Sequence, residues 1–121
     1  MGNNEFSQAG MAMAFDSTLA ERVRDRLASL EGVTEKKLFG CACFLLRGNV
    51  VAGVWRHWLV VRVGREEYEY ALRERYVNPF DITGKPLRGW VRIEPEGVER
   101  DEQLDDWIGR AVRFVSTLPA A

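Results

Sequence analysis

Four strand-like segments with very short connections follow one another in the first half of the chain. They span residues 34–39, 42–46, 50–55 and 58–63. The Gly48-Asn49 pair is typical of a two-residue hairpin turn, and Arg56-His57 forms another short connection. Because parallel strands need a crossover of about a dozen residues or more, these strands must pair antiparallel. The segment therefore predicts an antiparallel β-meander, which limits the possible folds more than any other feature of the sequence.

Amphipathic helices are predicted on either side of this meander. The first begins near residues 16–18, with a capping box formed by Thr18 and Glu21, and ends at Glu31-Gly32. The other is long and ends at Pro119. Its apolar residues recur at helical spacing: Leu104, Trp107, Ile108, Ala111, Val112, Val115 and Leu118. An apolar stripe of this width needs a partner surface, so we expect the helix to pack on the sheet.

A short helix, a loop and one more strand are predicted between the meander and the last helix. Residues 66–74 predict the short helix. Residues 76–89 contain Pro79, Gly84 and Pro86, so they predict an ordered loop with a short extended piece at residues 80–82. Residues 90–93 predict a further strand. The expected fold class is therefore α+β: an N-terminal helix, an antiparallel meander of about four to five strands, a short helix and a long C-terminal helix packed on the sheet.

The length and composition predict a single domain. The chain has 121 residues, of which 46% are apolar, and this suffices for one hydrophobic core. Residues 1–14 show no apolar periodicity and are interpreted as a tag or disordered tail, so the domain is expected at residues 15–121. The opening lacks the features of a secretion signal, and the longest apolar stretches fall far short of the roughly 20 residues that span a bilayer. We expect a soluble, cytoplasmic protein without membrane contacts.

Few groups in the sequence could perform catalysis or bind a metal. Cys41 and Cys43 lie two residues apart on a predicted strand, so their side chains point to one face, and a disulfide between them would be strained. His57, the only histidine, lies in a predicted turn. A zinc site needs three or four ligands, and no glycine-rich phosphate loop is present. We therefore expect buried structural thiols, no catalytic residues, no metal and no cofactor.

Two of the predicted strands carry tryptophan and arginine in alternation. Trp58, Val60 and Arg62 share one face of their strand, and Trp90 and Arg92 share one face of theirs. If a helix covers these faces, the tryptophans are core residues, and this is the interpretation that we prefer. If the faces coincide and are exposed, they form a surface that could bind a peptide or stack nucleic-acid bases. The possible partner-binding residues are then Trp58, Arg62, Arg88, Trp90 and Arg92.

The charge balance disfavours a dedicated nucleic-acid binder. The chain carries 17 Lys and Arg against 18 Asp and Glu, whereas such binders usually present a strongly basic surface. A nucleic-acid-associated factor is nevertheless an alternative if the cations of the more basic first half cluster. These are Arg22, Arg24, Arg26, Lys36, Lys37, Arg47 and Arg62.

A further alternative is a small-ligand binder or an enzyme that uses the loop at residues 76–90. Long irregular loops in compact domains are often functional. This hypothesis expects a deep pocket lined by Tyr76, Arg88 and Trp90.

Several motifs along the chain are similar in order and spacing to those of the TfoX/Sxy family. They are Lys37-Leu38-Phe39-Gly40, Gly48, Gly53, Leu59-Val60-Val61-Arg62-Val63, Pro79-Phe80, Thr83-Gly84-Lys85-Pro86 and Gly89-Trp90, with Trp107 in the last helix. From residue 15 to residue 118 the chain resembles the N-terminal domain of this family. The resemblance implies an α+β domain in the bacterial cytoplasm and a relation to regulators of competence for DNA uptake. It implies no enzyme activity and no catalytic residues, and it makes Phe39, Gly40, Gly84 and Gly89 determinants of the fold.

The sequence departs from the family pattern in two respects. The full-length competence regulators carry a second, helical domain that does not follow here, and Cys41 stands where the family commonly has another glycine after Phe-Gly. A role in competence is therefore not assumed. The expected function is that of a non-enzymatic binding or regulatory module that acts through protein contact with an unknown partner. A homodimer is one form that this contact could take.

Overall fold

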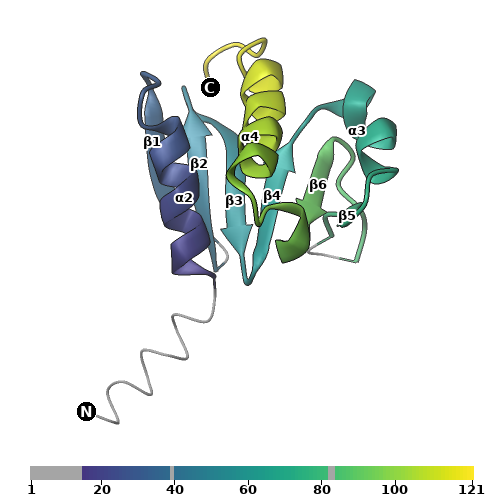
Figure 1. Cartoon of the computed structure of the whole chain (residues 1–121). Coiled ribbons are helices and arrows are strands. Elements are labelled where there is room, and N and C mark those ends of the chain that lie inside the picture. The colour runs from purple at the N-terminus through teal and green to yellow at the C-terminus, as the bar shows by residue number, and fades with distance from the viewer. Residues whose placement is uncertain (1–14, 39, 82–83) are drawn as a thin grey trace, which may run out of the picture.

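A six-stranded antiparallel sheet carries helices on one side in the computed structural model, which describes residues 15–38, 40–81 and 84–121 (Figure 1). The elements are α2 (Ser17–Leu27), β1 (Val33–Leu38), β2 (Cys41–Leu46), β3 (Asn49–Trp55), β4 (Trp58–Arg62), α3 (Arg65–Leu72), β5 (Val77–Pro79), β6 (Trp90–Ile93), a 3-10 turn (Pro95–Gly97) and α4 (Asp101–Val115). The strands lie in the order β1-β2-β3-β4-β6-β5. The α+β class, the meander of β1 to β4 and the long last helix are confirmed. No helix in the described ranges is long and apolar enough to cross a membrane.

The strand β5 (Val77–Pro79) was not predicted and raises the number of strands above the expected four to five. It lies at the sheet edge and pairs with β6, with Val77 opposite Ile93. Asn78 and Pro79 are poor strand formers, and proline is tolerated only where no ladder hydrogen bond is needed, as at an edge. The expected extended piece at 80–82 lies partly outside the described residues. Phe39 and Thr83 lie wholly outside them. Strand β5 therefore exists because β6 pairs with it, and three residues carry too little pattern to predict it.

Helix α2 begins within the expected range but with a different cap. Asp16 is the N-cap, and its Oδ1 accepts a hydrogen bond from the Leu19 N–H at 3.0 Å. Thr18 already lies inside the helix, so the predicted capping box of Thr18 and Glu21 is wrong. Aspartate and threonine both favour N-cap positions, and Asp16 and Thr18 lie only two positions apart, so local preference does not decide between them.

One apolar core lies between the helices and one face of the sheet. Helix α2 contributes Val23 and α4 contributes Leu104, both with no exposed area. From the sheet, Leu59 and Val61 of β4 are equally buried and belong to the same cluster. Tyr68 of α3 joins it as well. All three helices therefore bury their apolar faces in the same core on the same side of the sheet.

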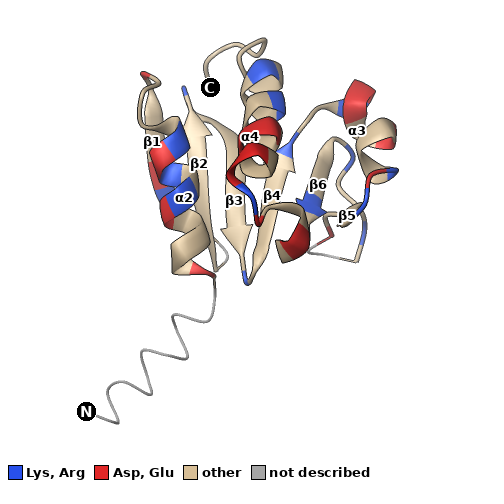
Figure 2. Ribbon diagram, in the orientation of Figure 1, with Lys and Arg blue, Asp and Glu red and all other residues tan. Residues whose placement is uncertain are grey.

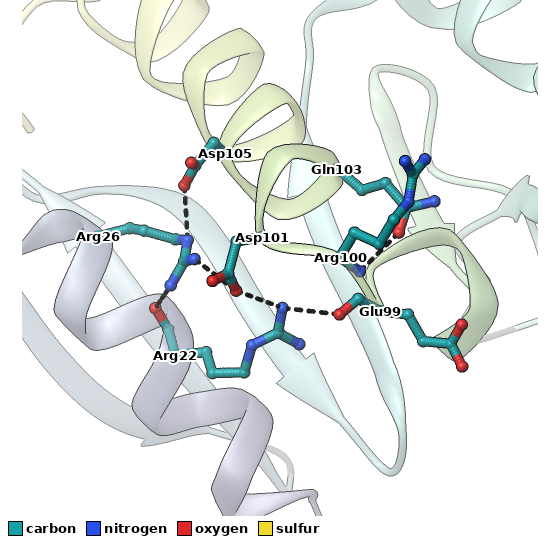
Figure 3. Close-up of polar contacts among 7 residues, drawn as sticks. All are labelled: Arg22, Arg26, Glu99, Arg100, Asp101, Gln103 and Asp105. Carbon is teal, nitrogen blue, oxygen red and sulfur yellow. Dashed lines mark hydrogen bonds and ion pairs between the residues drawn. The ribbon is translucent and has the colours of Figure 1, made fainter.

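An ion bridge connects α2 to the start of α4 at the edge of this core (Figure 3). The guanidinium of Arg26 lies 2.7 Å from Oδ1 of Asp105 and 3.0 Å from Oδ1 of Asp101. Arg22 lies 3.2 Å from the same Asp101 oxygen. The Arg26 side chain is only 19% exposed, so its charges are screened less by water than those of a typical surface pair.

The Arg26–Asp105 pair is expected to stabilise the fold modestly. In a double-mutant cycle with Arg26→Ala and Asp105→Ala, we expect a coupling free energy of about 0.5–1 kcal/mol that falls with added salt. The cycle is read from urea denaturation. The same cycle on Arg88 and Glu69, which are 3.9 Å apart and 66% and 63% exposed, should give no measurable coupling. Equal coupling in both cycles would contradict a specific bridge between the helices.

Candidate functional site

The sheet face opposite the helices carries the tryptophans and arginines that alternate in the sequence. On β4, Leu59 and Val61 point into the core, so Trp58, Val60 and Arg62 point to the other face. Val60 lies opposite Arg92 and Arg62 lies opposite Trp90 in the antiparallel register with β6. The two alternating faces therefore coincide.

The interpretation of Trp58 and Trp90 as core residues under a helix is wrong. Both side chains are half-buried and stand outside the core cluster. The helices of the described chain all pack on the opposite side, so none of them covers these rings. Alternation in a strand shows which residues share a face, but the face that the helices cover depends on how distant segments pack.

Aromatic rings form a continuous band on this side, which no described helix covers but which is not fully open, since Phe80, from the segment after β5, and Val60 are only 6% and 3% exposed there. Trp55 and Trp58 are paired across the β3–β4 turn, with ring centroids 5.3 Å apart. Phe80 lies 6.0 Å from Trp55 and 6.4 Å from Trp90. We call this surface the Trp/Arg face. It consists of Trp55, Trp58, Arg62, Phe80, Trp90 and Arg92.

Guanidinium groups lie over the rings of the Trp/Arg face. Arg92 is 4.0 Å from the Trp58 ring centroid, and Arg62 is 5.3 Å from that of Trp90. Arg56, in the adjoining turn, is 5.3 Å from that of Trp55. A guanidinium stacked on an indole keeps its N–H donors at the ring edge, where they can meet a carboxylate or a phosphate.

These cations are poorly neutralised within the described residues. Arg62 forms no ion pair with them, and the nearest carboxylate oxygen to Arg92 belongs to Glu94 at 3.8 Å. The Nε of Arg92 is buried without a hydrogen-bond partner in this part of the chain. An unpaired donor is unfavourable, and Arg62, which has no ion pair with the described residues, should attract an anionic group.

The Glu94 carboxylate serves neutral donors instead. One oxygen accepts a hydrogen bond from Trp58 Nε1 at 3.1 Å, and the other accepts one from Asn78 Nδ2 at 3.0 Å. These bonds fix the orientation of the Trp58 indole on the sheet. Glu94 therefore orients the Trp58 ring through a hydrogen bond and pairs only loosely with Arg92, at 3.8 Å.

Arg88 does not join the other possible partner-binding residues. It lies in the loop before β6, and its Nη2 is 3.9 Å from the carboxylate of Glu69 on α3. Trp55 and Phe80 belong to the Trp/Arg face although the sequence pattern did not predict this. Trp55 could have been found, since a two-residue turn places it directly opposite Trp58.

The described residues of the loop, 76–81 and 84–90, do not bring Tyr76, Arg88 and Trp90 together around one pocket. Tyr76 lines a hollow of about 480 Å³ together with Glu74 and Arg100. Neither Arg88 nor Trp90 lines it. A larger hollow of about 710 Å³ lies between the start of α3 and the end of α4, and it includes no residue of this loop.

The cations proposed for nucleic-acid contact do not form one cluster. Arg24 pairs with Glu35 at 2.7 Å on the helical side, where Arg22 and Arg26 pair with Asp101. Lys36 shares the face of Arg62 but lies three strands away, roughly 14 Å in the direction of the sheet hydrogen bonds. The seven cations that this alternative requires are therefore divided between the two sides of the sheet, and three of them are held in ion pairs.

The thiols and the imidazole stand apart from each other. Cys41 is buried and Cys43 is half-buried on β2, whereas His57 is exposed in the β3–β4 turn. Across the described ranges, no group of three His, Cys, Asp or Glu side chains is placed to hold a metal ion.

Comparison with known proteins yields one match. The family model described as the TfoX N-terminal domain matches residues 25–115, which covers the sheet, α3 and α4. No curated protein and no solved structure matches the chain.

Proposed function

The chain belongs to the TfoX N-terminal domain family, and we propose on this premise that it is a non-enzymatic binding module that contacts a protein partner through the Trp/Arg face. One observation carries the proposal: a band of aromatic rings with poorly neutralised guanidinium groups lies on a sheet face that no described helix covers. The relation of the family to regulators of competence supports a regulatory role in the bacterial cytoplasm.

The residue types of the Trp/Arg face are those that dominate protein interfaces. Tryptophan and arginine are enriched at positions where truncation costs more than about 2 kcal/mol of binding free energy. The sheet register positions Trp58 and Trp90, and a hydrogen bond to Glu94 further fixes Trp58, so little conformational entropy is lost on binding. A rigid aromatic platform of this kind suits a partner segment that lies along the strands.

The partner segment should carry carboxylates. Arg62 and Arg92 lack strong counter-ions, and Arg56 adds positive charge in the adjoining turn. Acidic residues gather instead on the helical side, at α3 and the first part of α4 (Figure 2). Two copies joined through this face would bring cations against cations, which is unfavourable. An acidic segment that also bears aromatic or apolar side chains is the better complement.

The proposal is tested by selecting random peptides on the purified protein. We expect enrichment of peptides with several Asp or Glu residues beside an aromatic residue. Measured by fluorescence anisotropy, the affinity of a selected peptide should fall at least about tenfold, or ~1.4 kcal/mol, in Trp90→Ala and in Arg62→Gln. Arg88→Gln is the matched control, because Arg88 is equally cationic but lies off the face, and it should bind as the parent protein does.

Three outcomes would contradict the proposal. One is that no acidic peptides are selected although circular dichroism shows that the protein and all its variants are folded. Another is salt-sensitive binding of a single-stranded oligonucleotide that Trp90→Ala abolishes, which would assign the face to nucleic acid. A third is a dimer in light scattering that Trp90→Ala converts to a monomer, which would assign the face to a second copy.

A further inference from the structure

Glu94 brings a carboxylate next to one of the cations of the Trp/Arg face. It directly follows β6, and its hydrogen bond to the Trp58 indole places it on the side of the sheet that no described helix covers. Its Oε2 lies 3.8 Å from Nη2 of Arg92, whose guanidinium lies 4.0 Å from the centroid of the Trp58 ring. A negative charge therefore stands beside a guanidinium that an anionic partner would approach.

The position of this carboxylate is fixed by three segments of the chain. Its Oε1 accepts the hydrogen bond from Trp58 Nε1 on β4, and its Oε2 accepts the one from Asn78 Nδ2 on β5. The backbone N–H of Glu94 donates to the carbonyl oxygen of Tyr76 at 2.8 Å. Moving the carboxylate away from Arg92 would break both side-chain bonds, so its charge stays in place when an anion approaches.

The hydrogen bonds by themselves do not need a charge at this position. Trp58 and Asn78 both offer neutral N–H donors, and a glutamine could accept from Trp58 and donate to the amide oxygen of a turned Asn78 side chain. The charge does not satisfy Arg92 either, because Nε of Arg92 is buried without a hydrogen-bond partner among the described residues. The orientation of Trp58 thus accounts for the hydrogen bonds of Glu94 but leaves its negative charge unexplained.

We infer that this charge makes the Trp/Arg face selective for a peptide over a single-stranded nucleic acid. The inference rests on the proposed function of the face. A negative charge placed beside a binding cation acts against any partner that must bring its own negative charge to the same place. This gives the charge of Glu94 a role that its hydrogen bonds do not provide.

A nucleic acid meets this charge whatever its sequence. A strand whose bases stack on Trp58 and Trp90 carries a phosphate at every nucleotide, so a phosphate comes close to Glu94. A peptide can instead place a carboxylate at Arg62 and an N–H donor at Glu94. The Glu94 side chain is 32% exposed, and its oxygens can accept more than the two hydrogen bonds that they receive from described residues.

The substitution Glu94→Gln tests the inference, because it removes the charge and can keep the hydrogen bonds. Fluorescence anisotropy at low salt measures the binding of a labelled oligothymidylate and of an acidic peptide selected on the parent protein. The oligonucleotide should bind about three- to tenfold more tightly to the variant, as expected for the loss of one repulsion at roughly 6 Å near a protein surface. The slope of log affinity against log salt concentration should steepen by about 0.7, because Arg92 gains one phosphate contact.

The peptide should not share this gain. Its affinity should stay unchanged, or fall by up to about threefold if one of its N–H groups donates to Glu94. Glu69→Gln is the matched control, because it removes the same charge at a site off the face, where Glu69 is 63% exposed and lies 3.9 Å from Arg88. It should leave both affinities unchanged. The double variant Glu94→Gln/Arg92→Gln should lose the gain for the oligonucleotide, because that gain depends on Arg92.

Two outcomes would overturn the inference in variants that circular dichroism shows to be folded. Equal gains for both ligands would mean that Glu94 weakens every anion alike. An oligonucleotide affinity that is unchanged or undetectable in Glu94→Gln would mean that its charge opposes no phosphate. Failure of the proposed function looks different, because then no peptide is selected on the parent protein, and the oligonucleotide comparison still decides the role of Glu94.

Discussion

Replacing Phe44 with alanine should lower the free energy of unfolding by about 3–5 kcal/mol. The ring is 1% exposed and lies on β2 in the core beneath the helices. Its loss removes apolar contacts and leaves a cavity that rigid strands on both sides cannot close. Urea denaturation, with an unchanged slope and a lower midpoint, measures the effect.

The control for this variant is Leu30→Ala. Leu30 follows α2 and is 37% exposed, so its truncation should change the free energy of unfolding by less than about 0.5–1 kcal/mol. Because a domain of this size is stable by only about 5–15 kcal/mol, the Phe44 variant should also be partly unfolded at modest denaturant. A cost below about 1 kcal/mol at Phe44 would show that the core is not packed as described.

Replacing Gly64 with alanine should cost about 2–6 kcal/mol, with two separable causes. Gly64 connects β4 to α3 with φ of +91° and ψ of 161°, a backbone region that is essentially restricted to glycine and costs an L-residue about 1–3 kcal/mol. A Cβ there would also lie 2.5 to 3.0 Å from three atoms of the Phe114 ring on α4. Relieving this overlap requires Phe114 or the helix to move, at about 1–3 kcal/mol. Thermal and urea denaturation measure the sum.

Gly84→Ala isolates the conformational cost. Gly84 has the same φ of +91°, but no atom of the described residues other than its chain neighbours lies within 4 Å of the added Cβ. We expect a loss of only about 1–2 kcal/mol there. The double variant Gly64→Ala/Phe114→Leu should recover part of the loss, since leucine vacates some of the ring volume. Equal costs at Gly64 and Gly84 would mean that Phe114 does not pack against the start of α3.

The two sides of the sheet have distinct roles in this description. The helical side holds the core to which the stability predictions refer, and the other side holds the Trp/Arg face. Phe44 and Gly64 therefore report on the fold, whereas Trp90→Ala and Arg62→Gln report on binding in variants that circular dichroism shows to be folded. Arg62 needs this control because its guanidinium also lies 5.7 Å from the ring centroid of Phe114 on α4.

Local patterns in the sequence determined the elements that depend on near neighbours. The short connections at Arg47-Gly48, which was predicted one residue later at Gly48-Asn49, and at Arg56-His57 required antiparallel strands. The spacing from Leu104 to Val115 required the long α4 helix. These features arise from hydrogen bonds and side-chain periods within a few residues, so they can be predicted without knowledge of the rest of the chain.

Tertiary structure alone decided which side of the sheet became the candidate site. On β4 both alternating sets are largely apolar, Leu59 and Val61 on one side and Trp58 and Val60 on the other, so periodicity cannot tell which set the helices bury. The choice follows from packing among segments far apart in sequence, as does the pairing of Arg26 with Asp105 across 79 positions. Strand β5 is a further case, because its three residues are ordered by their pairing with β6. Long-range contacts of this kind depend on the summed burial and charge of the whole domain, which no local window contains.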